Sequence, residues 1–217
     1  MVTGNYELAE HRVICNNVSW HIFEQLLTEL GEDRSTRLAY DDGTLEIMTP
    51  LGPHENNNRF IERLIGAIAD ELNLTIKTFG SLTLKRETRL KGAEPDSCYY
   101  LQNEPLVRHK QTINLDHDPP PDLVLEIDIT SGSLDKRPIY AALGVPELWR
   151  YNEKKIEVFV LQQPILIFNQ VNQSPTFPWM PLNAIPRFIN QSLVDGETAT
   201  LRAFRLGLGN KIMLSNN

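Results

Sequence analysis

The sequence predicts an α/β fold in which helices flank a mixed central sheet, with an N-terminal helix and hairpin before it and a C-terminal extension after it. Two observations carry this prediction. Residues 119–151 have the pattern of a strand, a helix and a second strand, which is the βαβ unit of a parallel strand pair. A long amphipathic helix opens at Pro53, and short strand-like runs separate it from that unit. We expect one domain over residues 1–217, with a core at about 36–160 and the extension at about 161–217.

The first strand of the βαβ unit carries carboxylates on one face. Its apolar face comprises Leu123, Leu125, Ile127 and Ile129. Its other face comprises Asp122, Val124, Glu126, Asp128 and Thr130. Because both faces of such a strand are usually covered, these acids are expected to be buried. A buried carboxylate needs an Arg, a Lys or a hard divalent cation as its partner.

The helix of this unit offers one such partner. Ser133 is the expected N-cap, and a helix of about three turns ends at Gly144, which suits a left-handed cap. Lys136 and Tyr140 are four residues apart and therefore share a helix face. If that face looks back at the strand, the ammonium of Lys136 stands near Glu126.

Two elements are expected before the long helix. Residues 18–31 have apolar residues at helical spacing and end on a glycine, which predicts a short amphipathic helix. Residues 37–48 contain Asp-Asp-Gly between two strand-like runs, which predicts a hairpin. Glu46 would lie on the hairpin face opposite its apolar neighbours, either exposed or as part of a site. Residues 1–17 show no clear pattern.

The long helix is predicted from Pro53 to about Leu74. Its buried stripe consists of Ile61, Leu64, Ile65, Ile68 and Leu72. Counting back along the stripe places His54 on the inward side of the first turn. There the ring is either satisfied by a neighbour or part of a site.

The remaining elements are short. Strands are expected at residues 75–79, 82–90, 98–101 and 156–161, a tight link at 92–95, a hairpin within 162–173, and helices at 188–194 and 198–208, with the last nine residues frayed. Asp96 follows a proline at the head of the strand at 98–101.

Composition limits the class of protein. The net charge of −7 argues against a protein that coats nucleic acid by bulk electrostatics. A local basic strip remains at Lys85, Arg86, Arg89 and Lys91, which is either a phosphate-contacting surface or an exposed hairpin kept soluble by its charges.

Neither a membrane nor a disulfide framework is indicated. No apolar run approaches the roughly 20 residues that cross a bilayer, and no basic-then-apolar signal opens the sequence, so we expect a cytoplasmic protein. Cys15 and Cys98 are expected to be reduced, and no Cys or His spacing suggests zinc.

The order of these elements, together with several motifs, resembles a known family. The motifs are GTLEIMTP, PHENNNRFIERL, GAEPDSCYY and PPDLVLEIDI followed by DKRPIYAALGVPELW. They resemble the Uma-two family of restriction endonuclease-like proteins, within the PD-(D/E)xK nuclease superfamily, over roughly residues 36–160.

The resemblance implies a restriction-endonuclease-like sheet and a site that binds Mg²⁺ or Mn²⁺ and hydrolyses DNA. On the matching positions, Asp96 and Glu126 resemble the metal-binding acids, with the backbone carbonyl of Ile127 as a third ligand. Asp128 stands where the superfamily has its lysine. Lys136, four residues before Tyr140, resembles the migrated lysine of the narrower family.

Other side chains are expected in supporting roles. These are His54, Glu46, Asp128, Asp122 and Tyr140. The physical case rests on chemistry that needs no family name, since paired carboxylates can hold a cation that activates water, and a lysine can stabilise developing charge.

Two other functions stay open at this point. The chain could be a nucleic-acid-binding module that has lost turnover, or a structural protein in which the acids are only paired. Metal binding separates the last from the other two, and turnover separates the nuclease from the inactive module. DNA is the expected partner, and the oligomeric state is left open with a homodimer as one option.

Overall fold

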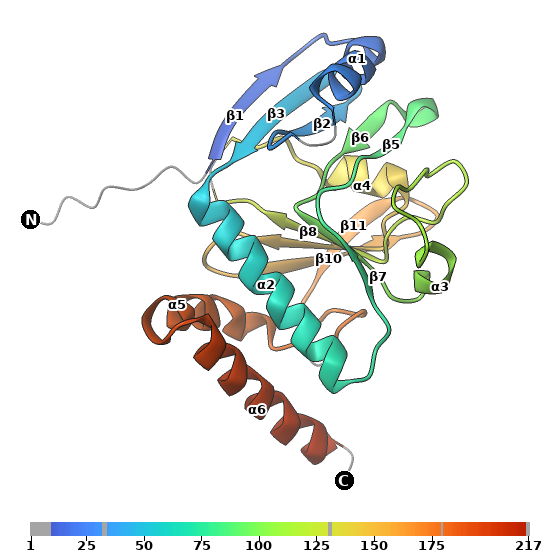
Figure 1. The fold of residues 1–217 in the computed structure, drawn as a ribbon. Helices are drawn as coiled ribbons and strands as arrows, with labels where there is room; N and C mark the ends of the chain where they lie inside the picture. Colours follow the sequence, from blue (N-terminus) through green and yellow to red (C-terminus); the bar gives the residue numbers. More distant parts are fainter. Residues whose placement is uncertain (1–9, 32–33, 130–131, 179, 216–217) are drawn as a thin grey trace, which may run out of the picture.

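The computed structural model describes residues 10–31, 34–129, 132–178 and 180–215, which form two sheets with helices around them (Figure 1). The N-terminal sheet, sheet A, has the order β1-β3-β2-β6-β5 and is antiparallel throughout. Its strands are β1 (Glu10–Cys15), β2 (Arg37–Asp41), β3 (Thr44–Pro50), β5 (Leu84–Arg86) and β6 (Lys91–Ala93).

The second sheet, sheet B, has the order β11-β10-β9-β8-β7-β4. Its strands are β4 (Lys77–Phe79), β7 (Ser97–Tyr100), β8 (Leu123–Ile127), β9 (Glu147–Tyr151), β10 (Ile156–Gln162) and β11 (Ile167–Val171). Among these, β8 and β9 are parallel and every other pair is antiparallel. The predicted mixed sheet with a central βαβ unit is therefore confirmed.

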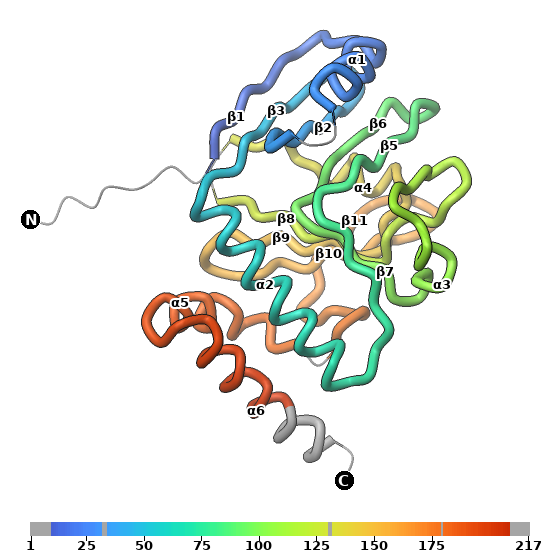
Figure 2. Tube along the Cα trace, viewed as in Figure 1, coloured from blue at the N-terminus to red at the C-terminus, as the bar shows by residue number. Residues whose placement is uncertain are grey.

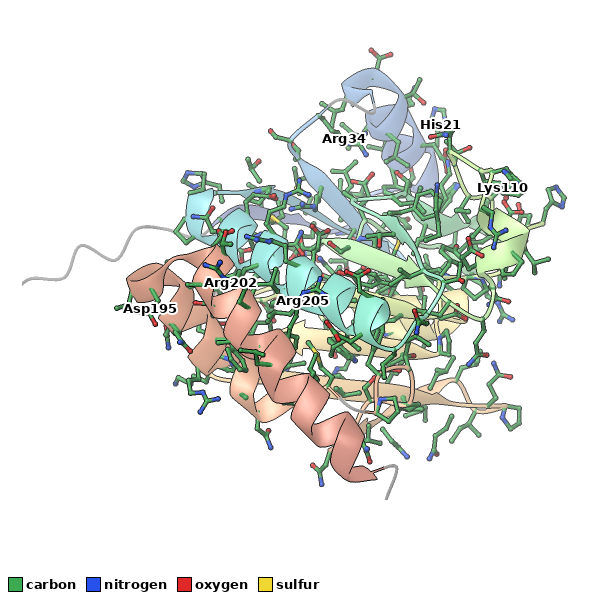
Figure 3. The ribbon with its side chains drawn as sticks, turned by 60° about the horizontal axis from the view of Figure 1, so that its bottom comes forward. His21, Arg34, Lys110, Asp195, Arg202 and Arg205 are labelled. Carbon is green, nitrogen blue, oxygen red and sulfur yellow. The ribbon has the colours of Figure 1, made fainter. Side chains whose placement is uncertain are left out.

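The described residues form six α-helices: three cover one face of sheet B, a short one lies between the other face and sheet A, and the first packs on sheet A. They are α1 (Trp20–Leu30), α2 (Gly52–Glu71), α3 (Glu104–Val107), α4 (Arg137–Leu143), α5 (Ile185–Asp195) and α6 (Glu197–Ser215), with short 3-10 turns at Glu87–Arg89 and Leu182–Ala184. Figure 2 shows α2 running across sheet B, with α5 and α6 packed beside α2. Arg205, labelled in Figure 3, joins α6 to α2 through ion pairs with Asp70 and Glu71.

The alternation of β8 divides the core as predicted. Leu123, Leu125 and Ile127 pack in the cluster that contains the α2 stripe and residues of α5 and α6. Val124 packs in a second cluster, where α4 lies between sheet B and sheet A. Glu126 shares the face of Val124, so its carboxylate points toward α4 and sheet A. Thr130 lies outside the described residues.

The hairpin and the long helix form as their sequences predict. Asp42 and Gly43, at the tip between β2 and β3, have φ angles of 42° and 95°, the left-handed pair that a two-residue turn requires. In α2, Ile61, Leu64 and Ile68 are fully buried. No helix in the described ranges is both long and apolar enough to cross a membrane.

Some predicted boundaries are wrong. The helix of the βαβ unit begins at Arg137, with Lys136 at its cap, and not after Ser133. Pro138 explains the late start, because a proline deeper inside a helix would clash with the carbonyl four residues before it. The Leu134 amide donates instead to Glu46 in sheet A.

Other segments also differ from expectation. The predicted link at 92–95 contains part of β6, which pairs with both β2 and β5. The first 17 residues, which show no pattern, contain β1 at the edge of sheet A. The end of the chain, predicted to fray, continues as α6 to Ser215. For β6 and β1, pairing with distant strands overrides a weak local signal.

Candidate functional site

Asp96 and Glu126 meet where β7 and β8 run side by side. Ser97 pairs with Leu125 in this antiparallel ladder. The residue before Ser97, which is Asp96, therefore lies opposite the residue after Leu125, which is Glu126. Residues opposite each other in such a ladder point to the same face. Both side chains are buried, with 1% of Asp96 and 6% of Glu126 exposed. The two acids proposed from the sequence are therefore neighbours.

Helix α4 supplies the partners of Glu126. Lys136 Nζ donates to Glu126 Oε2 at 2.6 Å, and the Tyr140 hydroxyl donates to Glu126 Oε1. The two residues sit one turn apart, with the Tyr140 amide donating to the Lys136 carbonyl at 3.0 Å. The spacing noted in the sequence thus brings an ammonium and a hydroxyl to one carboxylate.

Asp96 is held by the backbone and by an arginine from sheet A. The Ile127 amide donates to Asp96 Oδ2 at 2.7 Å, and Arg37 Nη1 lies 3.0 Å from Asp96 Oδ1. Arg37 also donates through Nη2 to Glu55 Oε1 at 2.9 Å. The sequence offered no signal for Arg37 beyond its place at the start of a strand.

Glu46 connects sheet A to this cluster. It is buried and accepts from Arg12 Nη1 at 2.6 Å and from the Leu134 amide at 2.8 Å. Lys136 Nζ lies 4.0 Å from Glu46 Oε1. Arg12 also pairs with Glu10, its neighbour on β1. Glu46 is therefore brought to the site, together with two residues from the patternless N-terminal segment.

His54 is fully buried at the start of α2, on the inward side that the sequence predicts. Its Nε2 lies 3.4 Å from Asp96 Oδ2 and 3.5 Å from Glu10 Oε2. Neither ring nitrogen has a hydrogen-bond partner among the described residues. Burial is the main cause that lowers the pKa of His54, with Arg37 acting in the same direction. The ring is therefore neutral at pH 7.

The other two acids predicted on this strand, Asp122 and Asp128, lie in different places. The carboxylate of Asp122 accepts from the Leu101 amide at 2.7 Å and from the Asn103 amide and side chain. It organises the loop after β7 and does not join the other acids. Asp128 lies on the rim of the site, with Arg150 Nη1 3.9 Å from its Oδ2.

A pocket of about 120 Å³ opens beside Glu126. Four cationic side chains line it, those of Arg12, Lys136, Arg137 and Arg150, together with the acids Glu126, Asp128 and Asp135. Each of the four cations pairs with a carboxylate, so the pocket is lined by mixed charges.

Several buried charges meet in this cluster. The buried carboxylates are those of Glu10, Glu46, Asp96 and Glu126. Cations that pair with them in the described ranges are Arg12, Arg37 and Lys136. Carboxylates that lie this close together favour a bound proton or cation between them.

The pKa shifts of Asp96, Glu126 and Lys136 reflect burial and the charges around each group. Burial raises the pKa of Asp96 to about 6, although Arg37 and Lys136 oppose the shift. Burial also raises the pKa of Glu126, and the charge of Asp96 adds to it. For Lys136, burial lowers the pKa, but Glu126, Glu46 and Asp96 outweigh burial, and the pKa is raised. Lys136 is therefore an ammonium at neutral pH.

The donors suit a hard divalent cation. Two adjacent carboxylates and a nearby backbone carbonyl are the oxygen ligands that Mg²⁺ and Mn²⁺ take. In the part of the chain that the structure describes, no three His, Cys, Asp or Glu side chains stand ready to hold a metal ion. Binding would therefore require Asp96 or Glu126 to exchange a present partner for the ion.

The basic strip lies apart from these acids, on the hairpin formed by β5 and β6. Lys85 Nζ contacts Glu24 at 2.6 Å, and Lys91 pairs with Asp41. Arg86 donates to the Leu115 carbonyl at 2.7 Å. Three of the four cations are therefore engaged by the protein itself, which agrees with the hairpin interpretation.

Comparison with known proteins places the chain in a family. No curated protein matches it. A solved structure described as "a putative nuclease belonging to DUF820 from Anabaena variabilis" is similar, with 15% sequence identity and a TM-score of 0.51 over 80% of this chain and 96% of that one. This similarity shows a shared fold. The model of the Uma2 family, described as "Putative restriction endonuclease", matches residues 20–184. The chain belongs to the Uma2 family, as its motifs predict.

Proposed function

We propose that the protein is a Mg²⁺- or Mn²⁺-dependent endonuclease that hydrolyses DNA phosphodiester bonds. The observation that carries this proposal is the meeting of Asp96, Glu126 and Lys136, with the ammonium of Lys136 2.6 Å from Glu126. Asp128 stands where the superfamily has its lysine. In this proposal Lys136, at the cap of α4, provides the ammonium that the superfamily lysine would provide.

Asp96, Glu126 and the carbonyl of Ile127 would hold the ion. When bound, the ion would lower the pKa of a water molecule and neutralise charge on the attacked phosphate. The burial of both acids supports this role, because an ion in a water-poor site interacts strongly with its ligands. Burial raises the pKa of both acids, so a positive ion beside them would offset the cost of their charged forms.

Lys136 acts as a fixed positive charge in this proposal. Because its pKa is raised, it is not a base. It can donate a hydrogen bond to the attacking water or stabilise the charge that develops on the phosphate. Tyr140 holds the other oxygen of Glu126, and burial raises its pKa far above the ordinary value, so its hydroxyl stays a donor.

The pocket beside Glu126 would receive the phosphate backbone. Arg12, Arg137 and Arg150 line it together with Lys136. Phosphate contacts from such side chains position nucleic acid without reading its sequence.

A second function has one observation in its favour. Arg37 already pairs with Asp96 and Lys136 with Glu126, so each acid has a cation of the protein. This arrangement suits a structural cluster, or a nucleic-acid-binding module without turnover. A buried pair of this kind needs no metal for its charge balance.

Cleavage of plasmid and single-stranded DNA with Mg²⁺ or Mn²⁺ tests the proposal. We expect turnover by the wild type and a loss of at least about 100-fold in Glu126→Gln. Glu153→Gln, a change of the same kind on an exposed turn, should cleave as the wild type does. Folded wild type without turnover under either metal would favour the inactive alternatives, and full activity in Glu126→Gln would show that the site is elsewhere.

A further inference from the structure

His54 is a buried polar side chain beside the site that the proposed reaction leaves unused. Its side chain has no exposed surface, and neither ring nitrogen has a hydrogen-bond partner within the described ranges. A buried donor or acceptor without a partner costs stability, so such groups in a folded protein call for an explanation. The ring points with Nε2 toward two carboxylates, Asp96 and Glu10.

The spacing around Nε2 fits the ligands of one metal ion. The distances from Nε2 are 3.4 Å to Asp96 Oδ2 and 3.5 Å to Glu10 Oε2. Two donors that are each about 2.1 Å from one ion lie about 3.0 Å apart at octahedral angles and about 3.4 Å apart at tetrahedral angles. The nitrogen and the oxygen of Asp96 thus stand about as far apart as neighbouring ligands do.

We propose that His54 is a nitrogen ligand of the divalent cation, bound beside Asp96, and that it makes the site select Mn²⁺ over Mg²⁺. This inference rests on the proposed function, because it concerns the same ion. Imidazole suits transition metals, whereas Mg²⁺ prefers oxygen ligands and gains little from a nitrogen. A neutral imidazole is also the form that binds metals.

The surrounding charges support a cation at this point. Asp96 and Glu10 place two carboxylates on the Nε2 side of the ring, and Glu126 stands opposite Asp96 across the ladder. The Asp96 oxygen nearest the ring, Oδ2, accepts from the Ile127 amide, and Arg37 holds Oδ1, so a small movement of Asp96 would free an oxygen for the ion. Glu10, on the same side of the ring, then adds negative charge beside the ion.

Pulsed electron paramagnetic resonance of the Mn²⁺-loaded wild type tests the ligand directly. We expect modulation from a coordinated ¹⁴N nucleus, replaced by a ¹⁵N signal when the protein is labelled with [¹⁵N]histidine. No variant is needed, so a folding defect cannot confuse the result. Bound Mn²⁺ without nitrogen coupling would overturn the inference and leave an all-oxygen nuclease site intact.

Titration calorimetry with Mn²⁺ and Mg²⁺ tests the selectivity. His54→Gln should lose at least about tenfold in Mn²⁺ affinity and less than about threefold in Mg²⁺ affinity. His117→Gln, on an exposed loop, is the matched control and should bind both ions normally. Mn²⁺ affinity in folded His54→Gln within about twofold of the wild type would also overturn the inference.

Asp96→Asn separates this inference from the proposed function. Loss of Mn²⁺ binding in Asp96→Asn, without nitrogen coupling in the wild type, would sink only the role of His54. Wild-type protein that binds neither ion at millimolar concentration would sink both, because the nuclease proposal itself requires the cation.

Discussion

Replacing Lys136 by alanine should abolish most cleavage and also destabilise the fold. Only 10% of its side chain is exposed, and its ammonium lies 2.6 Å from Glu126 Oε2. Removing one partner of a buried ion pair costs about 3–5 kcal/mol, because the other charge is left uncompensated. For a chain of 217 residues this corresponds to a fall of about 10 °C in melting temperature.

The expected catalytic loss is separate from the loss of stability. A donor that stabilises transition-state charge is worth about 100-fold to 1,000-fold in rate. Metal binding should change little, because the proposed ligands are Asp96, Glu126 and the Ile127 carbonyl. Lys136→Arg should rescue poorly, since a forked guanidinium does not replace a compact ammonium in a tight site.

Cleavage and melting should be measured on the same preparation, well below the melting temperature. Lys155→Ala is the matched control, because Lys155 also pairs with a glutamate, at 2.8 Å from Glu157, but is 54% exposed. Its loss should cost under about 1 kcal/mol and leave cleavage intact. Unchanged cleavage by folded Lys136→Ala would refute the catalytic role of the lysine outright.

Three further predictions follow from the site and the core. Since the folded pKa of Asp96 is raised to about 6 from 3.8, its stabilising contribution is present below pH 4 and lost as pH rises through 6. Metal-free wild type should therefore lose about 1 kcal/mol more stability between pH 5 and pH 7.5 than Asp96→Asn does, and equal pH profiles in urea unfolding would contradict this. Ile65→Ala should cost about 2–5 kcal/mol in urea unfolding, because Ile65 is 1% exposed in the cluster between α2 and sheet B, whereas a cost near zero would show that this face is not core. Gly92→Ala should lower the melting temperature, since an added Cβ would lie 2.7 Å from the Phe23 ring, and an unchanged value would mean that the ring moves aside freely.

Local sequence determined the central unit of this protein. The alternation around Glu126 defined both faces of β8, because side chains of a strand point alternately to its two sides. The four-residue spacing of Lys136 and Tyr140 placed both on one helix face, and the structure brings both to Glu126. The turn at Asp42 and Gly43 formed as its residue types require. These features depend on residues that are close together in the sequence, so the local sequence is sufficient to predict them.

Only the tertiary structure decided how the acids are compensated. Arg37 and Arg12 reach the site because sheet A packs against α4, and nothing near either residue in the sequence indicates it. Glu46 accepts from the Leu134 amide, 88 residues away and just before α4. Asp122 alternates with Glu126 as predicted but turns to the loop after β7. Ion pairs and hydrogen bonds between distant segments depend on how whole elements pack, and a periodic pattern within one element carries no information about that packing.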